Sequence, residues 1–188
     1  MKSNFAVLIS GYGRGAIEII KDYKSGLLNS GLKLIVSSSE ESYALKIAQS
    51  ENIKICVLKK DHFNNRNSYE NQILKTLKEH QIDYIFLAGW KYILFGNILH
   101  EYENKIVNIH PSLLPSFKGV KAIDQALNYG VKITGITTHF INEELDGGKI
   151  IGQKSVEIHE YDTFKTLDQK IFKKGIELQR ETINKIFV

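Results

Sequence analysis

The 188-residue sequence contains few cysteines and prolines, the residues that restrain a backbone through disulfide bonds or a rigid ring. It has one cysteine, Cys56, and two prolines, Pro111 and Pro115. A lone cysteine excludes an internal disulfide and a cysteine-based metal site, and it favours a reducing compartment. No apolar run approaches the ~20 residues of a membrane-spanning helix, and the N-terminal apolar stretch has no small-residue cleavage site. We therefore expect a cytoplasmic protein that works away from membranes.

The sequence also lacks a large excess of charge of either sign. Its 25 lysines and arginines against 21 aspartates and glutamates give a formal net charge of +4, and the basic residues are spread along the chain. This distribution favours small anionic ligands and does not require nucleic acid. The hydrophobic fraction of 43% is enough for one buried core, and no linker or repeat divides the chain. We expect a single domain over residues 1–188, whereas the oligomeric state leaves no signature.

Short apolar runs alternate with segments of helical periodicity. Runs typical of strands lie at residues 5–10, 32–36, 54–58, 83–88, 105–110, 132–141 and 150–158. Amphipathic helices are predicted at residues 16–23, 41–51, 68–80, 122–129 and 162–187. Alternation over the first two thirds indicates βαβ crossovers and a mostly parallel, doubly wound sheet. The loop between the last two strands is too short for a helical crossover, which favours antiparallel pairing there.

A glycine-rich turn, SGYGRGA at residues 10–16, follows an apolar strand and opens a helix. Gly11, Gly13 and Ala16 match the pattern G-x-G-x-x-A, in which backbone N–H groups at a helix N-terminus can bind a phosphate. A dinucleotide site would also need an acidic residue ending the second strand, but that strand reads LIVSSSEE, with serines first. The turn therefore favours a single phosphate, with Arg14 adding a cation. A turn without any ligand remains the alternative.

A second stretch, VNIHPSLLPSFKG at residues 107–119, places both prolines of the chain directly after a strand. Because strand side chains alternate, Asn108 and His110 point to the same face. They lie at a carboxyl-terminal strand edge, where open α/β sheets bind ligands. An asparagine amide can donate to an oxyanion, and a histidine can exchange a proton near neutral pH. The pattern indicates a catalytic pair, unless the two side chains only satisfy the strand end.

A third stretch, HFINEELDGGKII at residues 139–151, carries Asp146 before two glycines. Such a turn can carry the carboxylate inward between two strands, while Glu143 and Glu144 face water. An aspartate before Gly-Gly is most often only a turn residue. Beside His110, however, Asp146 would supply the anion that orients a histidine.

Four motifs occur in the order and at the spacings of the folate-dependent formyltransferases: LISGYGRG, LAGWKYIL, VNIHPSLLPSFKGVKAIDQAL and GITTHFINEELDGGKII. The chain most resembles the branch that acts on glycinamide ribonucleotide, and the resemblance covers residues 5–158. Its most specific parts are N-x-H-P-S-L-L-P and L-D-G-G. It implies an α/β, Rossmann-like fold, with a mostly parallel twisted sheet of about seven strands and helices on both faces.

The resemblance also implies the site. The family's catalytic asparagine, histidine and aspartate match Asn108, His110 and Asp146. The first two would donate to the oxyanion of a tetrahedral intermediate, while Asp146 would favour a protonated His110 and guide proton transfer from the amine through water. The co-substrate would be 10-formyltetrahydrofolate, without a metal, bound by Leu87, Trp90, Lys91, Tyr92, Ile93, Leu94, Leu99, Gly119, Ile141, Glu143 and Glu144. The amine substrate would contact Gly11, Tyr12, Gly13, Arg14, Gly15, Arg66, Pro111 and Thr137.

Two departures from the family pattern concern the amine substrate. Members that use glycinamide ribonucleotide typically read S-G-x-G-S-N at the first turn, where this chain has Arg14 and Gly15. Their last helix usually offers a glutamate, at a position where an ungapped comparison puts Lys173 or Lys174. We predict formyl transfer to glycinamide ribonucleotide in de novo purine biosynthesis, with Arg14 binding the 5′-phosphate unless it points to solvent.

Other functions stay open. The same chemistry could formylate a different amine, such as an amino sugar linked to a nucleotide. Deformylation of formyltetrahydrofolate would use the same three catalytic residues, although that branch carries an additional N-terminal regulatory domain that we do not expect here. A ligand-binding or nicotinamide-dependent protein could also reuse the fold.

Overall fold

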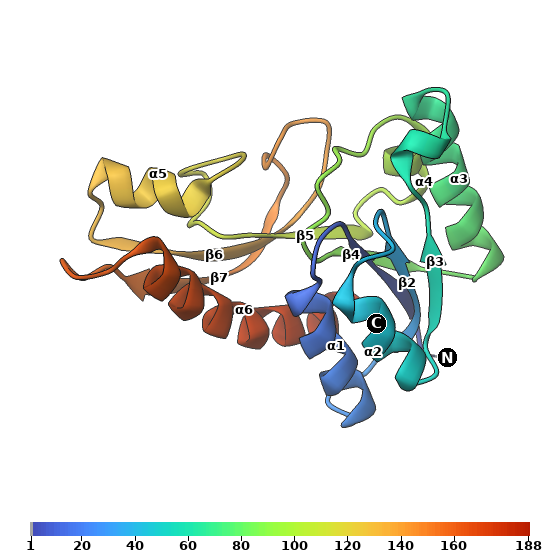
Figure 1. Cartoon of the computed structure of the whole chain (residues 1–188), viewed down its shortest axis with the longest axis horizontal. Coiled ribbons are helices and arrows are strands. Elements are labelled where there is room, and N and C mark those ends of the chain that lie inside the picture. Colours follow the sequence, from blue (N-terminus) through green and yellow to red (C-terminus); the bar gives the residue numbers. More distant parts are fainter. Residues whose placement is uncertain (1) are drawn as a thin grey trace.

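The computed structural model describes residues 2–188, which contain a seven-stranded sheet in the order β3-β2-β1-β4-β5-β6-β7 (Figure 1). The strands are β1 (Asn4–Ile9), β2 (Gly31–Ser37), β3 (Lys54–Val57), β4 (Tyr84–Leu87), β5 (Ile106–His110), β6 (Ile133–Phe140) and β7 (Ile150–Glu157). Strands β1 to β5 pair in parallel, whereas β6 pairs antiparallel with β5 and with β7. The predicted mostly parallel sheet and the antiparallel pairing of the last two strands are confirmed.

Helices cover both faces of this sheet, as predicted. They are α1 (Arg14–Lys24), α2 (Tyr43–Ser50), the 3-10 helix η1 (Lys60–His62), α3 (Arg66–Glu79), α4 (Asn97–Glu101), α5 (Ala122–Tyr129) and α6 (Phe164–Ile186). Helices α1, α2 and the end of α6 pack on one face of the parallel strands, and α3 and α4 pack on the other (Figure 1). In the part of the chain that the structure describes, no helix is both long enough and apolar enough to cross a membrane.

The central strand β1 illustrates why an apolar run folds in this way. Phe5, Val7 and Ile9 belong to the core that includes α1 and α2, whereas Ala6 and Leu8 belong to the core that includes α3. All five side chains are fully buried. A parallel strand covered on both faces needs apolar residues at every position, and an unbroken apolar run therefore predicts it.

Two short helices and one pairing were not predicted. Helix α4 spans five residues and η1 spans three, too few for a periodic pattern to emerge. The antiparallel pairing of β5 with β6 was also missed. The connection between them contains α5, and a connection of that length can lead to a parallel or an antiparallel neighbour.

The strand order positions the candidate site. Strands β2 and β3 lie on one side of β1, and β4 and β5 lie on the other, so the sheet has a topological switch point between β1 and β4. Two hydrogen bonds join the turns after these strands, from Ser10 N to Gly89 O at 3.2 Å and from Lys91 N to Ser10 Oγ at 3.0 Å. Open α/β sheets bind ligands at such a point. The fold thereby brings the first glycine-rich turn next to the segment that follows β4.

Gly135 in β6 provides a test of how tightly β6 and β7 pack. A Cβ atom there would clash with Lys154 O of β7 and would lie 2.8 Å from Leu113 Cδ2. We expect Gly135→Ala to lower the free energy of unfolding by about 1–3 kcal/mol, because the β7 backbone must shift. Gly11→Ala is the control, since nothing lies within 4 Å of its Cβ position. Urea denaturation measures both, and equal stability of the two variants would contradict this packing.

Candidate active site

Strand β5 presents two polar side chains at its carboxyl end, Asn108 and His110. Both border the same cavity, and Ile109 between them also reaches its edge but packs against a core cluster that includes α6. In the antiparallel register with β6, Asn108 lies opposite His139 and His110 lies opposite Thr137. The neighbouring strand therefore adds its own side chains to this edge of the sheet.

Asp146 approaches the pair from the loop between β6 and β7. Its backbone φ of 49° lies in the left-handed region, which aspartate adopts more readily than most residues. Gly148 permits the tight turn, because a Cβ atom there would clash with Phe140 O. The Asp146 side chain is 7% exposed, whereas Glu143 and Glu144 are exposed. The carboxylate thus points inward, as the Asp-Gly-Gly sequence predicted.

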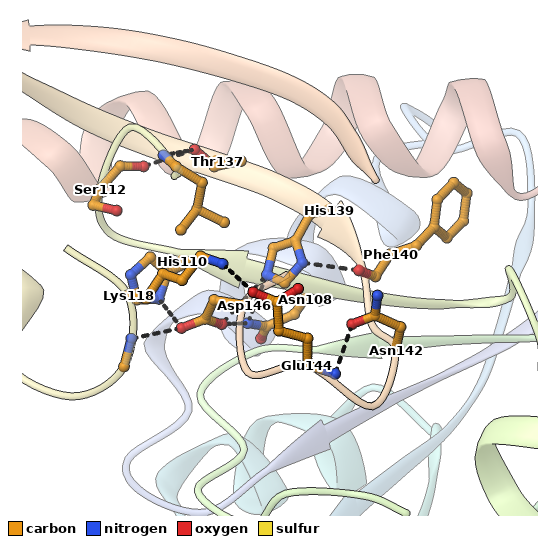
Figure 2. Close-up of polar contacts among 12 residues, drawn as sticks. Asn108, His110, Ser112, Lys118, Thr137, His139, Phe140, Asn142, Glu144 and Asp146 are labelled. Carbon is orange, nitrogen blue, oxygen red and sulfur yellow. Dashed lines mark hydrogen bonds and ion pairs between the residues drawn. The ribbon is translucent and has the colours of Figure 1, made fainter. Parts of the chain in front are cut away.

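Figure 2 shows Asp146 surrounded by side chains of two strands. Its Oδ2 lies 3.3 Å from His110 Nδ1 and accepts a 2.8 Å hydrogen bond from Gly119 N. Its Oδ1 lies 3.4 Å from Asn108 Nδ2 and 3.5 Å from His139 Nε2. The three residues predicted to be catalytic therefore meet around one carboxylate.

His139 belongs to the same cluster and was not predicted. It is 1% exposed, and its Nε2 lies 3.2 Å from Asn108 Nδ2. Its Nδ1 lies 2.8 Å from Phe140 O, so Nδ1 carries a hydrogen, and Nε2 faces both Asn108 Nδ2 and Asp146 Oδ1. In the sequence, His139 lies two residues after Thr137. This position indicates a site residue only once β6 is known to pair with β5. Despite the two histidines and the carboxylate, no group of such side chains within residues 2–188 has the arrangement of a metal site.

Charge and hydrogen bonding set the protonation of this cluster. Burial raises the pKa of Asp146, but hydrogen bonds from His139 and Gly119 N and the charge of His110 outweigh it, and the pKa lies below its usual value. The carboxylate is therefore ionised at neutral pH. His110 Nε2 lies 2.8 Å from Phe117 O, while Nδ1 faces Asp146. Both ring nitrogens face oxygen acceptors, and only a doubly protonated ring can donate to both.

A cavity of about 370 Å³ opens beside Asn108, His110 and Asp146, and we call it the Trp90 cavity. Among the residues predicted to bind the co-substrate, it is lined by Leu87, Trp90, Lys91, Tyr92, Ile93, Leu94, Gly119, Ile141 and Glu144. The other two predicted residues do not border it. Leu99 packs against the core that includes α3 and α4, and Glu143 is exposed.

A second cavity of about 350 Å³, here called the Arg14 cavity, opens beside the first glycine-rich turn. It is lined by residues predicted to contact the amine substrate, namely Gly11, Tyr12, Gly13, Arg14, Gly15 and Pro111, and by residues of α6 that include Asp168, Phe172 and Gln179. Gly89 and Ile109 border both cavities. The two cavities therefore meet at the strand end that carries Asn108 and His110.

Arg14 has a protein partner that the sequence did not reveal. Its guanidinium forms an ion pair with Asp168 through both terminal nitrogens and lies 4.4 Å from the centre of the Phe172 ring. The hydrogen bond to Asp168 raises the pKa of Arg14. Lys173 and Lys174, which an ungapped comparison puts where relatives have a glutamate, do not line this cavity, and α6 contributes Asp168 and Phe172 instead.

Two further residues predicted to contact the amine substrate lie elsewhere. Arg66 borders a third cavity, which shares residues 91–94 with the Trp90 cavity but none with the Arg14 cavity. Thr137 is fully buried, and its Oγ1 donates to Ser112 O at 2.7 Å and accepts from Leu114 N at 3.1 Å. Thr137 therefore holds the loop between the two prolines and does not border either cavity.

The lowered pKa of Asp146 predicts a pH-dependent contribution to stability. Because the folded protein keeps this carboxylate charged at lower pH than the unfolded chain, the contribution is complete above the ordinary value of 3.8 and is lost as the pH falls below it. We expect the stability difference between the wild type and Asp146→Asn to shrink between about pH 5 and about pH 1. Urea denaturation across this range measures it, with exposed Asp61→Asn as the control. A difference that stays constant would contradict the assignment.

Comparison with known proteins agrees with this geometry. The family described as Formyl transferase matches residues 3–183. Phosphoribosylglycinamide formyltransferase of Bacillus subtilis (strain 168) is 36% identical over 169 residues, which cover 90% of this chain and 87% of the relative. Trifunctional purine biosynthetic protein adenosine-3 of Gallus gallus is 37% identical over 170 residues, but these cover 90% of this chain and 17% of that protein. The crystal structure of glycinamide ribonucleotide transformylase 1 from Geobacillus kaustophilus has a TM-score of 0.96 at 34% identity and is covered at 100% in both chains. The chain belongs to the formyl transferase family.

Proposed function

We propose that this protein transfers the formyl group of 10-formyltetrahydrofolate to the amine of glycinamide ribonucleotide, a step of de novo purine biosynthesis. The names of its relatives in Bacillus subtilis and Geobacillus kaustophilus support this activity. The observation that carries the proposal is the meeting of the Trp90 and Arg14 cavities at Gly89 and Ile109. A transfer between two substrates needs two sites that open onto one set of catalytic groups.

The Trp90 cavity suits the folate. Leu87, Trp90 and Ile141 give it apolar walls, while Asn142 and Glu144 add polar groups to its lining. A flat ring system with a few polar edges fits such a surface. A formyl group carried by this ligand comes within reach of Asn108 and His110, which border the same cavity.

The reaction first needs donors for a developing negative charge. Attack of the neutral amine on the formyl carbon produces a tetrahedral carbon with charge on its oxygen, and Asn108 and His110 can donate to that oxygen. In the free protein, Asn108 Nδ2 makes only long contacts, at 3.2 Å to His139 and 3.4 Å to Asp146. His110 Nε2 contacts Phe117 O and must turn from it to reach the substrate. One such donor contributes a factor of about 10²–10³ to kcat.

The reaction also needs two proton transfers. The amine nitrogen loses a proton as its bond to the formyl carbon forms, and folate N10 gains one as its own bond to that carbon breaks. Ionised Asp146 can take the first proton through water, and His110 can supply the second. Asp146 Oδ2 and His110 Nδ1 lie 3.3 Å apart, so the proton that Asp146 takes can pass to His110 and restore the ion pair.

The Arg14 cavity suits the 5′-phosphate of the ribonucleotide. Helix α1 begins at Arg14 after Gly13, with no side-chain cap and no acidic residue in its first turn. Its first backbone N–H groups are therefore available to an anion. A guanidinium has five N–H donors, and the two terminal nitrogens that contact Asp168 do not use all of them. Arg14 can bind a phosphate while Asp168 holds it near Phe172.

His110 and Asp146 act as a pair in this mechanism. We expect His110→Ala and Asp146→Asn each to lower kcat by about 10²-fold or more, because each removes a group that acts only in the transition state. The double variant should lose far less than the product of the two single losses. Absorbance change on folate conversion measures turnover, with exposed His159→Ala as the control. Near-normal turnover of either single variant would refute the mechanism.

Arg14 is the test of the amine substrate. We expect Arg14→Ala to raise the KM for glycinamide ribonucleotide by about tenfold or more, because a charge-assisted contact with the phosphate is lost. The KM for the folate should hardly change. Lys21→Ala is the matched control, because Lys21 is another cation of α1 and pairs with Glu18 at 2.7 Å. An unchanged ribonucleotide KM in Arg14→Ala would exclude Arg14 from phosphate binding. Absence of turnover in the wild type would point to another amine, such as a nucleotide-linked amino sugar.

A further inference from the structure

Two exposed tyrosines lie beside the Arg14 cavity. Tyr12 belongs to the first glycine-rich turn and is 63% exposed, and Tyr43, the first residue of α2, is 41% exposed. Their rings stack, with centres 5.2 Å apart and planes inclined by 19°. Tyr43 covers one face of the Tyr12 ring, and the large exposure of Tyr12 leaves the other face open. Because Tyr12 also borders the Arg14 cavity, an open aromatic surface lies at the edge of that cavity.

The backbone holds this pair of rings in place. Tyr12 O accepts hydrogen bonds from Ala44 N at 3.1 Å and from Ser42 Oγ at 3.3 Å, which tie the glycine-rich turn to the start of α2. Gly13 permits the close approach, because a Cβ atom there would lie 2.5 Å from Ala44 Cβ. An aromatic surface that is fixed before a ligand arrives loses little conformational freedom on binding. The pair is therefore suited to stack against a flat ring.

The proposed amine substrate would leave this aromatic surface unused. Glycinamide ribonucleotide consists of a phosphate, a ribose and a glycinamide arm, and it has no aromatic ring. Its phosphate would bind Arg14 and the first N–H groups of α1, a helix that begins two residues after Tyr12. Its amine must reach Asn108, where the two cavities meet, whereas Tyr12 borders the Arg14 cavity only. A flat ring on Tyr12 would thus belong to a ligand that extends from the phosphate site away from the catalytic groups.

We propose that the phosphate site of the Arg14 cavity also binds purine 5′-mononucleotides, with the base stacked on the open face of Tyr12. This inference rests on the proposed function. A mononucleotide has the same kind of phosphate as the amine substrate, one ribose away from a flat base, and bases stack on aromatic side chains. A purine has two fused rings and covers more of a tyrosine ring than a pyrimidine does. Because the two ligands share one phosphate site, a purine nucleotide would exclude the ribonucleotide and inhibit a step of its own synthesis.

Calorimetric titration of the free protein with adenosine 5′-monophosphate and with ribose 5-phosphate tests this inference without any folate. We expect the nucleotide to bind the wild type about tenfold more tightly than ribose 5-phosphate, because only the nucleotide has a base to stack. Tyr12→Leu should bring the two affinities to within about twofold of each other, since leucine keeps an apolar side chain but has no aromatic face. Glycinamide ribonucleotide should displace the nucleotide, as a shared phosphate site requires.

Tyr129→Leu is the matched control. Tyr129 is 80% exposed and its ring also contacts another aromatic ring, that of Phe117, but it borders neither the Arg14 cavity nor the Trp90 cavity. Its variant should keep the full advantage of the nucleotide.

Three results would overturn the inference and leave the proposed function standing. They are a nucleotide that binds the wild type no more tightly than ribose 5-phosphate, equal advantages of the nucleotide in Tyr12→Leu and Tyr129→Leu, and a bound nucleotide that the ribonucleotide cannot displace. Formyl transfer to glycinamide ribonucleotide is measured separately, and its absence would overturn both.

Discussion

The candidate site depends on one buried charge, the carboxylate of Asp146. A carboxylate removed from water is costly unless hydrogen bonds and opposite charge surround it. Here the contacts come from β5 through Asn108 and His110, from β6 through His139, and from the loop after β5 through Gly119 N. If the loop between β6 and β7 moved away, the groups that contact Asp146 would lose their hydrogen-bond acceptor and the charge that balances them. The contacts that would act in catalysis therefore also hold four segments in place.

The sheet topology explains how one edge can serve two substrates. The switch point between β1 and β4 opens the turns after both strands to the same side, and β5 lies next to β4 with its polar side chains at that edge. Ile109 points away from Asn108 and His110 yet borders both cavities, as does Gly89. The donor and the acceptor would thus be separated by little more than one strand end. This closeness lets a single set of catalytic groups contact both.

The parts of this arrangement that follow local rules could be predicted from the sequence. Strand β1 is covered on both faces and reads as an apolar run, strand alternation puts Asn108 and His110 on one face, and the glycines after Asp146 permit its turn. Partners distant in the sequence could not be predicted. Asp168 is 154 residues from Arg14, and nothing near either residue indicates their pairing. His139 required knowledge of the neighbouring strand, and Thr137, which the resemblance assigned to the amine substrate, contacts the loop after β5 through its Oγ1.

The Arg14–Asp168 pair indicates how an altered glycine-rich turn can still serve an anion. A cation at a helix N-terminus is unfavourable by roughly 0.3–1 kcal/mol, and Asp168 offsets this cost before any ligand arrives. Arg14 is 52% exposed, and Lys91 beside the Trp90 cavity is exposed as well. The phosphate of the proposed ribonucleotide would then meet a partly hydrated cation, whereas the reacting ends of both substrates would meet the buried groups around Asp146. Because salt screens exposed charges much more than buried ones, binding of the ribonucleotide should depend on ionic strength more strongly than the chemical step does.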